Sequence, residues 1–73
     1  MQTYKINTTT KDVILAVGPE SAGNFTVSQN GIIYHSDNFG DLLSEDNFYI
    51  FQKNMLDFLK EKEIIPNIIL SDL

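Results

Sequence analysis

The sequence predicts a small α/β domain, α+β by content, built in the order strand, strand, strand, helix, strand. Three observations indicate this fold class. Continuous apolar runs at residues 13–17 and 68–70 are typical of buried strands. Two alternating segments flank an Asn-Gly pair at residues 30–31, which favours a hairpin. Apolar side chains recur at helical spacing over residues 48–59, which predicts one long helix.

The first three strands are expected in the first half of the chain. Residues 13–17 form an apolar run ended by a Gly-Pro pair, and this run predicts a strand covered on both faces. Residues 25–28 alternate between apolar and polar side chains, which is the period of a half-buried strand. The Asn-Gly pair accepts positive φ at both positions, so we expect a tight turn into a return strand at residues 32–35.

The helix and the last strand are expected in the second half. Ser44 is a candidate N-cap, and the helix should end before Ile65 because Pro66 disfavours helical geometry in its predecessor. Residues 68–70 then predict a last buried strand. The predicted apolar stripe of the helix consists of Phe48, Phe51, Met55, Phe58 and Leu59.

These elements predict a mixed sheet with one helix packed on one face. A right-handed helical crossover links parallel strands, so the last strand should pair beside the first. The expected order, with strands numbered along the chain, is 3-2-1-4, which leaves residues 68–70 at an edge. We expect residues 12–73 to form a single domain. Residues 1–11 are either a flexible tail or an extra short strand, and the sequence leaves both open.

Composition limits the classes of function. The chain has 73 residues, no Cys and a net charge of −5, from ten acidic residues against five Lys. An acidic chain without Arg is a poor match for nucleic acid or for anionic membranes. No apolar run reaches the length of a signal peptide or a membrane span, so we expect a cytoplasmic protein.

Motifs for catalysis or metal binding are weak. The G-x-x-x-x-G spacing from Gly18 to Gly23 matches a phosphate loop, but Asn24 and Phe25 stand where Lys and then Ser or Thr are needed. His35 is the only His, and without Cys it cannot build a zinc site. No serine fits a Ser–His–Asp arrangement by any motif. We therefore expect no catalytic residue and no metal ligand.

One pattern spans residues 13–73 without a gap. Its matching positions are Leu15-Ala16-Val17-Gly18, Glu20, Phe25, Gly31, Ser36, Gly40-Asp41-Leu42, Pro66 and Asp72-Leu73. The pattern resembles the first part of the large catalytic domain of the HypF carbamoyltransferases. Those enzymes make the carbamoyl group that becomes cyanide in maturing nickel–iron hydrogenases. Their domain is related to the tRNA threonylcarbamoyl transferases, and the resemblance implies half of an actin-like, ribonuclease H-like lobe with ATP as a ligand.

The sequence also departs from the family pattern. Ala22 stands where the family has a loop Lys, and Asn38 and Ser71 replace two His residues. The family's paired metal-binding histidines and its second lobe follow beyond the matched segment. Catalysis in this fold needs groups from both lobes, so we expect the isolated chain to need no cofactor and to carry out no carbamoyl transfer.

Three hypotheses about function follow. The first is a non-catalytic association module in which the edge residues Ile68, Ile69 and Leu70 pair with another chain, either a second copy in a homodimer or a complementing protein. The second is a weak nucleotide or anion binder. Its candidate residues are Gly18, Glu20, Ser21 and Asp41. The third is one part of a split carbamoyltransferase that is active only with a second chain.

Overall fold

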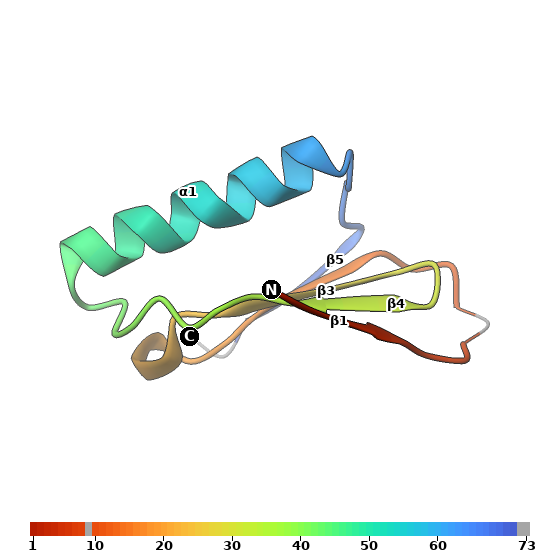
Figure 1. Ribbon diagram of the computed structural model, residues 1–73, viewed down its shortest axis with the longest axis horizontal. Coiled ribbons are helices and arrows are strands. Elements are labelled where there is room, and N and C mark those ends of the chain that lie inside the picture. Colours follow the sequence, from red (N-terminus) through yellow and green to blue (C-terminus); the bar gives the residue numbers. More distant parts are fainter. Residues whose placement is uncertain (9, 72–73) are drawn as a thin grey trace.

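The computed structural model describes residues 1–8 and 10–71, which form one sheet and one long helix (Figure 1). The strands are β1 (Gln2–Lys5), β2 (Ile14–Val17), β3 (Phe25–Gln29), β4 (Ile32–His35) and β5 (Ile68–Ser71). A short 3-10 helix, η1 (Glu20–Ala22), follows β2, and the helix α1 (Glu45–Glu61) connects β4 to β5. In Figure 1, α1 lies along one face of the sheet, and no other helix covers the opposite face of the described chain.

The sheet has five strands in the order β1-β4-β3-β2-β5. The four-strand order expected from the sequence is therefore wrong, because it lacks the N-terminal strand β1 at the edge beside β4. The additional strand β1 runs antiparallel to β4, with Tyr4 opposite Ile33. Just beyond this pair, the backbone N–H of Ile6 donates to the Gly31 carbonyl at 2.7 Å. Pairing with β1 gives the backbone groups on the outer side of β4 their partners. The neighbours among the other four strands are those that the crossover argument predicts.

The predicted hairpin between β3 and β4 is confirmed. Gln29 pairs with Ile32, so the turn consists of Asn30 and Gly31 alone. Both residues have positive φ, 52° for Asn30 and 77° for Gly31. These values match the turn whose twist follows that of the flanking strands.

The last strand pairs with β2 in parallel, as the crossover predicts, with Ile14 beside Ile68 and Ala16 beside Leu70. Asn67 fixes the start of this pairing. Its Oδ1 accepts from the Val13 N–H at 2.6 Å, and its own N–H donates to the Val13 carbonyl at 2.9 Å. This amide therefore ties the segment after α1 to the start of β2.

The predicted helix is also confirmed. Ser44 is its N-cap, and the Ser44 hydroxyl accepts from the Asn47 N–H. The helix ends at Glu61, before the position that Pro66 restricts. At Glu63 the backbone turns to a φ of 55°, and the Ile64 N–H donates back to the Leu59 carbonyl at 2.8 Å. This is the left-handed ending that satisfies the last carbonyls of many helices.

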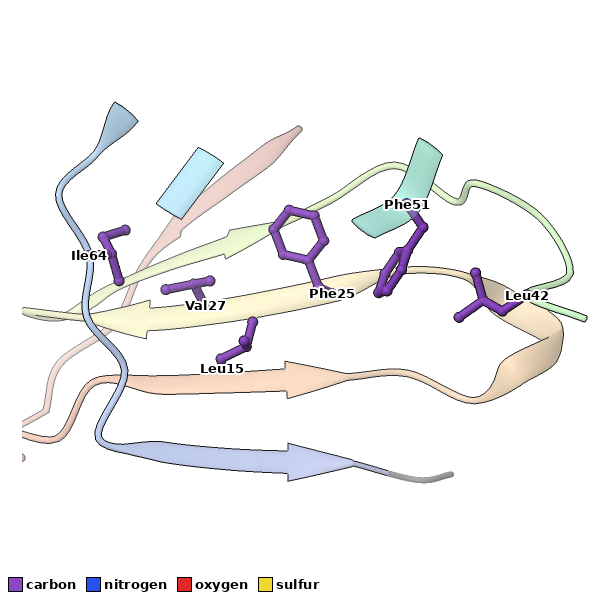
Figure 2. Close-up of a cluster of buried hydrophobic side chains, with 6 residues drawn as sticks. All are labelled: Leu15, Phe25, Val27, Leu42, Phe51 and Ile64. Carbon is purple, nitrogen blue, oxygen red and sulfur yellow. The ribbon is translucent and has the colours of Figure 1, made fainter. Parts of the chain in front are cut away.

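The core lies between α1 and the central strands (Figure 2). Phe25 and Val27 of β3 are 1% and 0% exposed, and Phe51 of α1 packs edge-on to Phe25 with ring centroids 6.1 Å apart. The six buried apolar residues drawn in Figure 2 are Leu15, Phe25, Val27, Leu42, Phe51 and Ile64. The core therefore occupies only the layer between the helix and one face of the sheet.

Two burial expectations are wrong, one for the strands and one for the first turn of the helix. In β2 only Leu15 is buried, and in β5 Ile69 and Leu70 are 66% and 54% exposed, because α1 covers one face and does not reach the β5 edge. Phe48 is 45% exposed. The 17 residues of α1 extend about 25 Å, whereas a strand of four or five residues extends about 15 Å, so the first helical turn projects beyond the sheet.

Candidate functional site

The β5 edge, defined as Ile68, Ile69 and Leu70, lies at the end of the sheet, where the predicted strand order placed it. Among the described strands, β5 pairs only with β2. Ile69 and Leu70 have neighbouring side chains that point to opposite faces, and both are more than half exposed. The edge therefore combines strand backbone with apolar side chains on both faces.

The other edge of the sheet is chemically different. The strand β1 reads Gln2-Thr3-Tyr4-Lys5, and it carries a Lys and no aliphatic side chain. Natural sheets protect their edges with charges, especially Lys, and with Pro. The β5 edge has neither device within the strand, which distinguishes it from β1 as a surface for pairing.

The face opposite α1, here called the open face, continues from the β5 edge. Backbone pairing aligns a row of side chains across all five strands of this face, and every member except one serine carries a large apolar group. The row consists of Tyr4, Ile33, Ser28, Ile14 and Ile68. A surface that covers the β5 edge therefore meets further apolar side chains on this face.

A pocket of about 270 Å³ opens at the carboxyl ends of β2 and β5. Gly18 and Asn24 form one part of its lining, and Leu70 and Ser71 form another. The Gly18 N–H donates to the Asn24 carbonyl at 3.0 Å, and a Cβ at Gly18 would overlap the Asn24 side chain. A side chain at position 18 would therefore displace the Asn24 side chain from this pocket. In open α/β sheets, ligands bind at the carboxyl ends of parallel strands.

The four residues predicted to bind an anion do not gather in this pocket. Only Gly18 belongs to its lining. Glu20 begins η1, and the structure describes its backbone alone, whereas Ser21 lies exposed in the same turn. Asp41 lies in the turn before α1, where its Oδ1 accepts from the Leu43 N–H at 2.9 Å. Asp41 thus shapes a turn in this structure.

Asn24 ends the loop in which the sequence placed the candidate anion site, but the other polar lining residues, Thr26 and Ser71, were not predicted. Thr26 lies on β3 and Ser71 on β5, far apart in the sequence, so no local spacing joins them. The Asp72-Leu73 pair of the family pattern lies outside the described residues.

The lone histidine has a local partner. His35 Nδ1 and Thr26 Oγ1 lie 2.8 Å apart across the β3–β4 pair. Within residues 1–8 and 10–71, no three His, Cys, Asp or Glu side chains cluster closely enough to hold a metal ion. None of the helices in this part of the chain is both long and apolar enough to cross a membrane.

Comparison with known proteins identifies a family for this chain. The model of the family described as the HypF Kae1-like domain matches residues 9–73. No curated protein and no solved structure matches the chain. The family match covers nearly the whole chain and includes β2 to β5 with α1. The chain belongs to the HypF Kae1-like domain family.

Proposed function

We propose that this chain is a non-catalytic association module that pairs its β5 edge with a strand of another chain. The observation that carries the proposal is the exposure of Ile69 and Leu70 on a strand that has one neighbour among the strands the structure describes. Strand addition gives main-chain hydrogen bonds to the incoming segment and burial to the alternating side chains. Burying one such aliphatic side chain contributes about 2 kcal/mol.

Two partners fit the same edge. A second copy pairs antiparallel about a two-fold axis, and the uncharged Ile68–Leu70 segment then places no like charges opposite each other. A separate chain carrying other HypF elements completes the sheet instead. Family membership favours the second partner and suggests a role in hydrogenase maturation. The two chains together would then form an actin-like, ribonuclease H-like lobe.

Sedimentation velocity over a range of protein concentrations tests the module. If the protein is a dimer and Ile69→Lys, a substitution on the exposed strand, converts it to a folded monomer, the result supports pairing between two copies. Leu56→Lys is the matched control. Leu56 is 53% exposed on α1, so this substitution introduces the same charge away from the β5 edge.

Amide hydrogen exchange separates the remaining outcomes. Amides of neighbouring residues on a strand point to opposite edges, and the Ile68 N–H donates to the Val13 carbonyl, so the Ile69 N–H points away from β2. A monomer whose Ile69 amide exchanges rapidly has an available edge, and its partner is then a different chain. A monomer whose β5 amides are as protected as those of β3 has an edge covered from within, and the proposal fails.

A second candidate function is weak binding of a nucleotide or anion in the pocket at the carboxyl ends of β2 and β5. The specific observation is the location of Gly18, Asn24 and Ser71 around one opening. The net charge of −5 and Ala22 at the family's Lys position oppose this function. In calorimetric titrations with ATP, Ala22→Lys should strengthen binding, and equal absence of heat in both proteins would reject the candidate.

A further inference from the structure

A second groove, of about 260 Å³, lies between the later part of α1 and the segment that follows β4. Met1, Phe25, Phe39 and Phe58 form its apolar lining, and Asp37, Asp57 and Glu61 bring carboxylates to it. We propose that this aromatic groove binds an arginine side chain presented by a partner protein. The site is separate from the β5 edge and does not depend on the function proposed for that edge.

The phenylalanine rings are fixed by the core. Phe25 is 1% exposed and points from β3 toward α1 (Figure 2), and its ring centroid lies 5.8 Å from that of Phe58. Phe39 packs edge-on to Phe51 at 6.3 Å. Aromatic faces attract cations and also accept the apolar stem of a long side chain. Phe25 supports the wall from within the core, and the partly exposed rings of Phe39 and Phe58 offer a rigid apolar surface to a cationic group.

The carboxylates stand on both sides of these rings. Asp57 and Glu61 are four residues apart on α1, which places them on the same side of the helix. Asp37 comes from the segment after β4, and its side chain is 77% exposed. An incoming cation thus meets negative charge from both walls, which is the complementarity that selects a basic partner.

Two cations already lie at the groove and pair with its carboxylates. Lys53 Nζ lies 2.9 Å from Asp57 Oδ2, and the hydrogen bond and charge of Asp57 raise the pKa of Lys53. The Met1 ammonium lies 3.5 Å from Asp37 Oδ1. Exposed pairs of this kind contribute little to stability, so an incoming guanidinium can replace them.

Arginine fits this groove better than lysine does. Its planar guanidinium stacks on aromatic rings and donates in a fork that matches a carboxylate. Lysine is a compact, strongly hydrated charge that gains less from a ring surface. The same carboxylates repel phosphate groups, so nucleic acid is not a partner at this surface.

NMR titration with the peptide acetyl-Gly-Arg-Gly-amide tests the proposal. We expect the ring signals of Phe39 and Phe58 and the side-chain amide of Asn54, which also lines the groove, to shift. The citrulline peptide has nearly the same shape without the charge, and it should leave these signals in place. Equal shifts with both peptides, or no shifts with arginine, overturn the proposal.

Two matched variants localise the binding. Glu61→Gln removes a carboxylate of the groove, and we expect at least tenfold weaker binding of the arginine peptide. Glu63→Gln makes the same charge change two positions away at a residue outside the groove lining, and binding should be retained. An equal loss in both variants means that arginine responds to overall charge, and the assignment of this groove is then wrong.

Discussion

Ser36 is the buried polar side chain of the described residues, at 6% exposure, and it joins two segments of the fold. Its Oγ accepts from the Phe25 N–H at 2.8 Å and donates to the Asp37 carbonyl at 2.9 Å. The hydroxyl therefore holds β3 beside the segment that leaves β4. This segment carries both Phe39 and Asp37 to the aromatic groove, so one buried hydroxyl supports a proposed binding surface.

Ser36→Ala should lower the free energy of unfolding by about 1–3 kcal/mol, because the Phe25 N–H loses its acceptor in a buried position. Urea denaturation followed by circular dichroism measures the change. Ser21→Ala, at an exposed position, is the control and should leave the midpoint nearly unchanged. Equal midpoints for the two variants would mean that water replaces the hydroxyl.

Gly31→Ala should lower the free energy of unfolding by about 1–2 kcal/mol, because the φ of Gly31 is 77° and a new Cβ would lie 3.0 Å from the Ile6 carbonyl oxygen. Asn30→Gly keeps a residue that accepts positive φ and serves as the control. Thermal unfolding of both variants gives the comparison. A neutral Gly31→Ala would show that the turn and the nearby end of β1 rearrange freely.

At the scale of elements, the helix depends on its first turn. Ser44 caps α1, and Glu45 and Asp46 place negative charge near the positive end of the helix dipole. Ser44→Ala should lower the free energy of unfolding by about 1 kcal/mol. Ser44→Asp should retain most of the stability of the parent protein, because an aspartate at this position can also accept from the N–H of Asn47. Chemical denaturation of the three proteins distinguishes loss of the cap from a general effect of substitution.

The elements were largely predictable from local sequence, and their burial was not. The Asn30-Gly31 turn and the Ser44 cap are local signals that give the observed boundaries closely, whereas Pro66 gives only an outer limit, because α1 already ends at Glu61. Exposure of Ile69 depends instead on where α1 crosses the sheet, which spacing does not specify. The pocket lining was not predictable from local sequence either, because Thr26 and Ser71 come together only through the order of the strands in the sheet.

At the scale of the whole molecule, the charge of −5 makes salt a diagnostic variable. Two copies that pair at the β5 edge repel each other, so a dimer should become tighter as salt rises from about 0.05 to 0.5 M, where charges beyond a few ångströms are screened. Arginine binding in the aromatic groove should weaken over the same range. Sedimentation and NMR titration at both salt concentrations measure the opposite trends. If dimerisation and arginine binding change in the same direction with salt, the two do not differ in their electrostatics as proposed.

The parallel pairing of β2 with β5 has a consequence for the order of folding. Val13 and Asn67, which this pairing joins, are 54 positions apart, whereas the β3–β4 hairpin closes over two residues. Closing a long loop costs chain entropy before contacts compensate for it. The hairpin therefore forms early and β5 docks late. Until it docks, β2 is itself an open edge, and a strand from another molecule competes for the place that β5 later fills.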